Sequence, residues 1–276
     1  MPKIKISDIN LYYELHGAGE PLVLINGYAD NTGHWFRQLP GLAQEYQVIV
    51  FDNRGAGQSD KPDIPYTMQM FAQDVSGLLE ALSVDAANVY GVSMGGMIAQ
   101  EFAINYPEKV ISLVLGCTTC GGTHLVMPDA EVVTFLLDEE RLKRLTPEEA
   151  AREMFSLTCT QEFVTNNPDV VEGYIAATVQ HAAPMYSPKR QAEAILAHDT
   201  YDRLPQIKAP TLVIAGSADR IMPVENSRLI ASRIPNAELV LLKNVGHGFF
   251  YQAADKANNV ILDFLARGQH YQTKHM

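Results

Sequence analysis

A serine surrounded by glycines is the first feature of this sequence that could do chemistry. Gly91-Val92-Ser93-Met94-Gly95 has the pattern G-x-S-x-G and lies between the apolar run "NVY" and the helical pattern "MGGMIAQEFAINYP". Between a strand and a helix, this motif holds a serine hydroxyl on a sharp, strained turn above a sheet. The helix also points its N-terminal amides at the same place. The pattern predicts Ser93 as a nucleophile, although the motif alone also arises by chance.

A serine nucleophile needs a base to remove its proton, and the base needs a group that orients it. His247 lies in a glycine-flanked loop after the apolar run "ELVLL". Asp219 lies in the loop after "PTLVIAG", whereas the loop after the preceding run, "GCTTCGGTHLVMP", has no carboxylate before Asp129. The order serine, acid, histidine predicts a triad of Ser93, Asp219 and His247. The alternative is that Asp219 is a turn residue and His247 an ordinary loop histidine.

These three residues come from loops that alternating strands and helices must bring together. The apolar runs "PLVLING", "YQVIVFD", "NVYGVS", "VISLVLG" and "PTLVIAG" are typical of strands buried on both faces of a parallel sheet. "KIKIS" and "NLYYELHG" predict an antiparallel hairpin at the start. The sequence therefore predicts an α/β fold: a mostly parallel central sheet with an N-terminal antiparallel hairpin and helices on both faces.

The stretch from about residue 121 to 204 interrupts this alternation. It contains no clear strand, and four segments have amphipathic helical spacing: "DAEVVTFLLDEERLKRL", "TPEEAAREMFSLT", "NPDVVEGYIAATVQH" and "SPKRQAEAILAH". Thr146 and Glu149 have the spacing of a capping box. We expect a core formed by residues 1–120 and 205–276, with residues 121–204 inserted as a helical lid.

The sequence resembles the α/β-hydrolase-fold serine hydrolases. The matching segments are "LINGYADN", "FDNRGAGQSDKP", "VYGVSMGG", "PTLVIAGSADRIMP" and "NVGHGFF", and they cover the chain on both sides of the expected lid. The group it resembles holds small esterases, enol-lactonases, cofactor-free haloperoxidases or perhydrolases, and C–C bond hydrolases. The resemblance implies the same fold and a reaction without metal or organic cofactor.

The resemblance also implies an oxyanion hole formed by two backbone amides, those of Tyr28 and Met94. The family usually has a His-Gly pair after the strand that "PLVLI" matches, whereas this chain has Asn26-Gly27. A backbone donor does not depend on the preceding side chain, so the hole can survive the change. Asn26 then either braces the loop or faces the substrate.

Two further residues are candidate substrate contacts. Trp35 follows the loop that holds the expected oxyanion donor, and His124 lies at the start of the lid. The alternative for Trp35 is packing under the lid, and for His124 a structural or exposed position. Asn26, Trp35 and His124 complete the expected substrate site.

Other chemistries are excluded or disfavoured. "GAGQS" lacks the third glycine and the helix of a dinucleotide-binding turn. Cys117 and Cys120 form a C-x-x-C without the second pair that a zinc site needs, so we expect two free thiols near the mouth of the site.

The amino-acid composition limits the binding partners and the compartment that we expect. The net charge of −11 disfavours nucleic acids and anionic membranes. Three cysteines and a start without an apolar leader favour a cytoplasmic protein. The oligomeric state, monomer or homodimer, stays open.

The expected function is hydrolysis of carboxylic esters through an acyl-enzyme on Ser93, with a small-molecule ester or lactone as substrate. Lactone opening, perhydrolysis and C–C bond cleavage could use the same triad. A ligand-binding protein that has kept the fold without turnover is an alternative of another class.

Overall fold

The computed structural model describes residues 2–142 and 144–272. In these residues an eight-stranded sheet has the order β1-β2-β4-β3-β5-β6-β7-β8. Its strands are β1 (Lys3–Ile6), β2 (Ile9–His16), β3 (Pro21–Ile25), β4 (Gln47–Phe51), β5 (Ala87–Val92), β6 (Val110–Gly116), β7 (Thr211–Gly216) and β8 (Ala237–Leu242). β2 pairs with β1 and β4 in antiparallel fashion, and the strands from β4 to β8 pair in parallel. This sheet confirms the predicted fold class.

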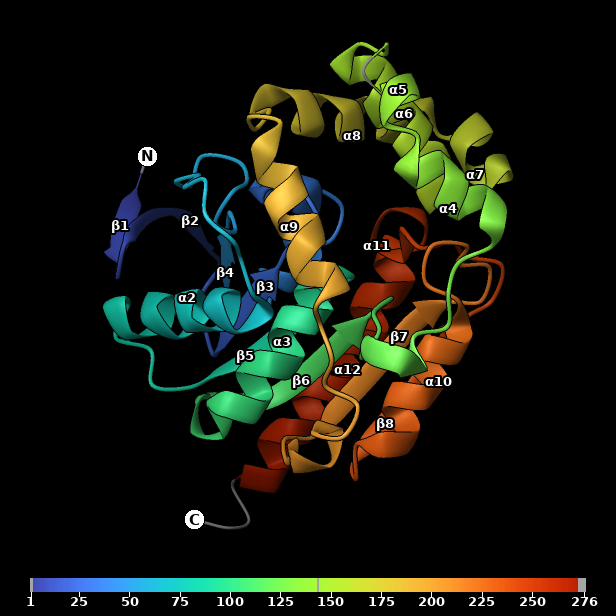
Figure 1. Ribbon diagram of the computed structural model, residues 1–276. Helices are drawn as coiled ribbons and strands as arrows, with labels where there is room; N and C mark the ends of the chain where they lie inside the picture. Colours follow the sequence, from blue (N-terminus) through green and yellow to red (C-terminus); the bar gives the residue numbers. More distant parts are fainter. Residues whose placement is uncertain (1, 143, 273–276) are drawn as a thin grey trace.

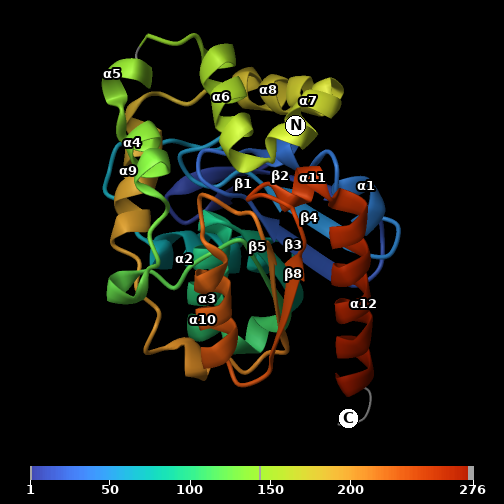
Figure 2. The same ribbon diagram turned by 90° about the vertical axis from the view of Figure 1, so that its right-hand side faces the viewer.

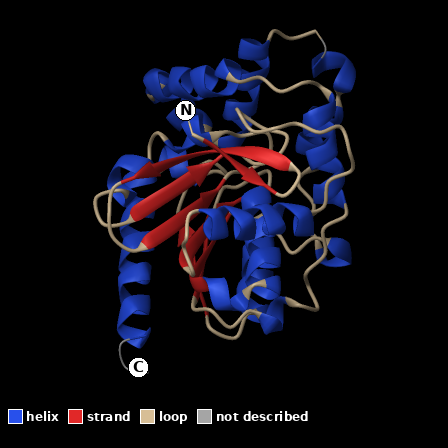
Figure 3. Cartoon of the chain, turned by 90° about the vertical axis from the view of Figure 1, so that its left-hand side faces the viewer, coloured by secondary structure: helices blue, strands red, loops and turns tan. Residues whose placement is uncertain are grey.

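Helices cover both faces of the sheet (Figure 2). One face carries α2 (Met68–Ala81), α3 (Met94–Asn105) and α10 (Val224–Arg233), and the other carries α1 (Leu39–Leu42) and α12 (Ala254–Gln272). α11 (Phe249–Gln252) precedes α12. Short turns of 3-10 helix, η1 (Thr32–Trp35), η2 (Pro107–Lys109), η3 (Gly122–His124) and η4 (Leu204–Gln206), lie in the connections. The twisted sheet is visible between the two helical layers (Figure 3). None of the described helices is long and apolar enough to cross a membrane.

The segment between β6 and β7 is helical, and we call it the helical insert. It contains α4 (Ala130–Leu137), α5 (Glu139–Leu142), α6 (Pro147–Thr158), α7 (Gln161–Asn166), α8 (Pro168–Gln180) and α9 (Tyr186–Leu196). Figure 1 shows α4 to α8 gathered above one end of the sheet, with α9 running back to the core. The capping box predicted for Thr146 is present. The amide of Thr146 donates to Oε2 of Glu149 at 2.8 Å, and the amide of Glu149 donates to Oγ1 of Thr146 at 3.2 Å.

The insert has more helices than the sequence pattern predicts. The first predicted helix is divided at Asp138, which ends α4 with non-helical backbone angles. The additional α7 ends at Asn166, because the next residue, Asn167, precedes Pro168 and a residue before proline disfavours helical angles. A helix this short leaves little periodic signal.

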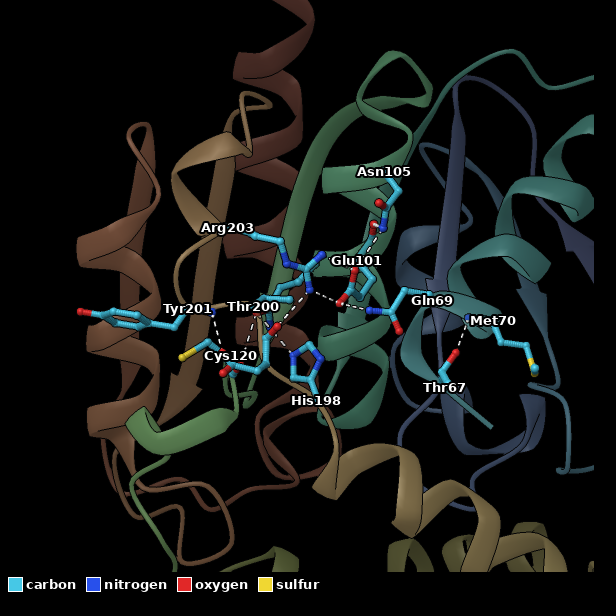
Figure 4. A network of polar contacts seen from close by, with 12 residues as sticks. Thr67, Gln69, Met70, Glu101, Asn105, Cys120, His198, Thr200, Tyr201 and Arg203 are labelled. Carbon is cyan, nitrogen blue, oxygen red and sulfur yellow. Dashed lines mark hydrogen bonds and ion pairs between the residues drawn. The ribbon is translucent and has the colours of Figure 1, made fainter. Parts of the chain in front are cut away.

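A buried ion pair anchors α3, the helix that begins after Ser93. The Glu101 carboxylate is 1% exposed and accepts hydrogen bonds from Arg203 at 2.9 Å, Gln69 at 2.8 Å and Asn105 at 3.0 Å (Figure 4). Beside it, Thr200 donates to Gln100 of α3 at 2.6 Å. These contacts tie α3 to the segment that leads from the insert into β7.

Glu101→Gln is expected to lower the free energy of unfolding by about 3 kcal/mol, because it leaves the Arg203 guanidinium without its buried counter-charge. Urea denaturation of the wild type and the variant measures the loss. The matched control is Glu238→Gln, which removes a pair with Arg267 that is 55% exposed on both sides and is expected to cost less than about 1 kcal/mol. Equal losses in the two variants would contradict a structural role for the buried pair.

Candidate active site

Ser93 occupies the turn between β5 and α3. It is the N-cap of α3 and has a φ of 54° and a ψ of −119°, a conformation that costs a non-glycine residue about 1–3 kcal/mol. Its amide donates to the carbonyl of Gly116 at 2.8 Å, which fixes the turn against β6. Its neighbours Val92 and Met94 are buried, while Ser93 keeps part of its surface accessible. The strained turn that the motif predicts is present.

The glycines around Ser93 are explained by close backbone contacts. A Cβ on Gly91 would lie 2.1 Å from the carbonyl oxygen of Gly95, and a Cβ on Gly95 would lie 2.1 Å from the carbonyl oxygen of Ile25. A Cβ on Gly96 would lie 2.6 Å from Cβ of Thr118. The start of α3 therefore packs against β3 and β5 through bare backbone, and any side chain at these positions would push the turn away from the sheet.

Asp219 and His247 come together at the ends of β7 and β8. Nδ1 of His247 donates to Oδ2 of Asp219 at 2.8 Å, and both side chains are more than nine-tenths buried. Oδ1 of Asp219 accepts from the amides of Ile221 at 2.9 Å and Met222 at 2.8 Å, so the carboxylate is held in the loop after β7. With its proton on Nδ1, His247 has Nε2 free to accept a proton.

The charge of Asp219 controls the protonation of His247. Burial lowers the pKa of His247, but the Asp219 carboxylate outweighs burial and raises the pKa well above the ordinary value of about 6.5. Cys117 also contacts His247. Burial raises the pKa of the Cys117 thiol, so the thiol stays neutral and the carboxylate is the charge that acts.

Cys117 lies next to both His247 and Ser93. Its side chain interacts both with the His247 imidazole and with the backbone of Ser93, and it is fully buried at the end of β6. Ser93 and His247 therefore both lie next to Cys117. Cys117 and Cys120 are free thiols, as expected, and both are fully buried.

Two backbone amides near Ser93 have no acceptor. The amide of Met94 is the first of α3, and the amide of Tyr28 lies in the loop after β3. No group in residues 2–142 and 144–272 accepts a hydrogen bond from either amide. Free amides at a helix start bind negative charge well, so these two are available to a developing oxyanion.

Comparisons with known proteins agree with this geometry. Residues 20–254 match the family model described as the alpha/beta hydrolase fold. The chain belongs to the alpha/beta hydrolase fold family. It is 31% identical to a protein of Azorhizobium caulinodans named "Putative carbamate hydrolase RutD", over 96% of this chain and 98% of the relative.

Two solved structures of alpha/beta hydrolases superimpose closely on the chain. The enol-lactonase from Burkholderia xenovorans LB400 has a TM-score of 0.83 at 25% identity, covering 96% of this chain and 100% of that one. The thermophilic esterase from Thermogutta terrifontis has a TM-score of 0.83 at 28% identity, covering 97% and 99%. The alpha/beta hydrolase architecture thus extends over nearly the whole chain.

Of the three expected substrate contacts of this alpha/beta hydrolase, two are buried and one is exposed. Asn26 is buried, and its Nδ2 donates to the carbonyl of Phe51 at 3.1 Å, so it braces the loop after β3. Trp35 is 2% exposed and packs on the rings of Tyr90 and Phe250. His124 is exposed and stacks on Tyr201 at 3.5 Å, and no described contact links it to His247.

The sequence pattern gave no sign of Gln252, which organises the loop of His247. Its Oε1 accepts from the amides of Gly246 at 3.0 Å and Thr160 at 3.2 Å, and its Nε2 donates to Oγ1 of Thr160 at 2.8 Å. The amide of Gly248 donates to the carbonyl of Thr158 at 2.7 Å. The junction of α6 and α7 is thus bonded to both sides of His247.

The insert also contacts the loop of Tyr28. The amide of Ala29 donates to the side chain of Gln191 in α9 at 2.8 Å, and Gln191 donates to the carbonyl of Arg54 at 3.0 Å. Among the described residues no cluster of three or more His, Cys, Asp or Glu could hold a metal ion.

Proposed function

We propose that this alpha/beta hydrolase cleaves carboxylic esters through an acyl-enzyme on Ser93. The observation that carries the proposal is the buried Asp219–His247 pair, which shares a contact with the Ser93 turn through Cys117. A strained serine together with an imidazole that a buried carboxylate orients is the arrangement that activates a hydroxyl for acyl transfer.

The steps follow from the positions of these groups. Nε2 of His247 accepts the proton of Ser93 as Oγ attacks the ester carbonyl, and the amides of Tyr28 and Met94 donate to the oxyanion. His247 then returns the proton to the leaving alkoxide, which departs as the alcohol. Water, deprotonated by the same imidazole, cleaves the acyl-enzyme and releases the carboxylic acid. Asp219 keeps the proton on Nδ1 and stabilises the imidazolium.

The relatives support this class of bond. An ester, an enol lactone and a carbamate all carry an acyl carbon bonded to a heteroatom that can leave, and these are the bonds in the names of the three proteins compared above. The direct test is hydrolysis of p-nitrophenyl esters from acetate to long acyl chains, followed by a panel of lactones. We expect turnover of at least one ester. If no ester or lactone is hydrolysed and a fluorophosphonate does not label Ser93, the proposal is wrong.

The pH dependence of kcat/KM is expected to have its acid limb above the free-histidine value of about 6.5. Only neutral His247 can accept the proton of Ser93, and the Asp219 carboxylate raises the pKa of that imidazole, so activity appears as the pH rises through the raised pKa. A pH–rate profile with a p-nitrophenyl ester measures the midpoint, with spontaneous hydrolysis subtracted at each pH. A midpoint below the free-histidine value would contradict this assignment of the base.

A further inference from the structure

A second carboxylate lies beside the Ser93 turn. Asp30 is in the loop after β3, two residues beyond Tyr28. A Cβ on Gly27 would lie 3.0 Å from Oδ2 of Asp30 and 3.5 Å from Cβ of Ser93. The carboxylate and the serine therefore flank the same point in the loop that supplies the expected oxyanion donor.

Asp30 has little to bond within the protein. Among the described residues, its carboxylate has one polar contact, with Oδ1 lying 3.5 Å from Nε2 of His34. Nδ1 of His34 accepts from the amide of Asn31 at 3.1 Å, so the proton is on Nε2, and Oγ1 of Thr178 lies nearer to it at 3.1 Å. No other donor to Asp30 is found in the described part of the chain. The side chain nevertheless keeps 19% of its surface accessible, so a ligand can reach it.

The surroundings of Asp30 are aromatic. Tyr174 packs on His34 at 5.1 Å and on Tyr251 at 5.5 Å between ring centres. The hydroxyl of Tyr251 is buried without a hydrogen-bond partner. Burial raises the pKa of Asp30, and the charge of Asp30 is among the groups that raise the pKa of Tyr174 and Tyr251. An incompletely bonded carboxylate in such surroundings is costly unless something donates to it.

We propose that Asp30 is a specificity-determining residue that accepts a hydrogen bond from a hydroxyl or amino group of the substrate, close to the scissile ester. The inference rests on the proposed function, and it names the substrate class: esters that carry an O–H or N–H donor near the carbonyl. Esters with a purely alkyl chain leave the carboxylate unsatisfied, and esters with a second carboxylate repel it.

Matched substrates test this preference. On the acyl side, p-nitrophenyl β-hydroxybutyrate and β-aminobutyrate are compared with p-nitrophenyl isovalerate, which has a methyl group in place of the donor. On the alcohol side, the propylene glycol monoester of butyric acid is compared with isobutyl butyrate. We expect kcat/KM to favour the donor-bearing ester by about ten- to a hundredfold in at least one series.

Variants of Asp30 test whether this substrate preference depends on its carboxylate. Asp30→Leu should reverse the preference, because the donor then loses its acceptor while the alkyl chain gains an apolar neighbour. Asp30→Asn keeps an acceptor oxygen without charge, so it should retain preference for a hydroxyl and lose preference for an ammonium group. Asp202→Asn removes an exposed carboxylate and serves as the charge-matched control.

Two outcomes overturn the inference. One is a preference within about twofold of unity in both series, which is less than the weakest expected hydrogen bond. The other is a preference that Asp30→Leu leaves in place while fluorophosphonate labelling shows an intact site. Calorimetric binding of the same esters to Ser93→Ala separates this test from the proposed function, because it reports the donor preference even if the wild type hydrolyses none of them.

Discussion

Ser93→Ala is expected to lower kcat for ester hydrolysis by about 10⁶-fold, the size of effect seen when a triad nucleophile is removed. Oγ of Ser93 is the proposed nucleophile, and without it no acyl-enzyme can form. The Asp219–His247 bond and the free amides remain, so a small residual rate is expected. Steady-state hydrolysis of the best p-nitrophenyl ester measures the change.

The control for this variant is Ser232→Ala, which removes an exposed hydroxyl in α10 that bonds only within its own helix. It should keep wild-type kcat. The two variants should also differ in labelling, since a fluorophosphonate should modify Ser232→Ala and not Ser93→Ala. A loss of only a few-fold in Ser93→Ala would mean that another group is the nucleophile.

Asp219→Asn is expected to keep the fold and lower kcat by about 10⁴-fold. The asparagine oxygen can still accept from the amides of Ile221 and Met222, so its NH₂ group takes the place of Oδ2 and faces Nδ1 of His247. Nδ1 must then accept, the ring proton moves to Nε2, and the imidazole can no longer accept the proton of Ser93. The structure therefore predicts a wrong tautomer in an intact loop.

The pH–rate profile of Asp219→Asn tests the same assignment independently. Loss of the carboxylate removes the charge that raises the pKa of His247 and leaves burial, which lowers it, so the acid limb of the residual activity should move to lower pH. Asp129→Asn, at the exposed start of α4, is the charge-matched control and should change neither kcat nor the midpoint. An unchanged midpoint in Asp219→Asn would show that the acid lies elsewhere.

The sequence allowed the sheet and the Ser93 turn to be predicted for a physical reason. Buried parallel strands are short apolar runs, and the polar or glycine residues that end them mark the edge where loops meet. Asp219 and His247 lie in the loops that follow β7 and β8, and the structure brings their side chains together. The spacing of Gly91 and Gly95 is equally local, because the backbones of these two glycines approach each other across the turn.

Other features left no local sign in the sequence. Gln252 bonds Thr160, which lies between α6 and α7 and is distant in the chain. Asp30 lies beside Gly27, and α8 supplies the Tyr174 ring near it. Such roles depend on tertiary contacts, which neither periodicity nor a motif encodes. The burial of Cys117 and Cys120 is a further example, since a loop sequence does not show what packs over it.

The bonds between Gln252 and Thr160 have a consequence for how the molecule responds to heat. They make the loop of His247 part of the same cooperative unit as the insert, whereas Ser93 belongs to the central strands. Partial opening of a protein proceeds by such units, and a peripheral helical unit opens at a lower free energy than a buried sheet. When the insert opens, His247 separates from Ser93 while the sheet stays folded. On warming, activity is therefore lost when the contacts between the insert and the core break, at a lower temperature than the sheet unfolds.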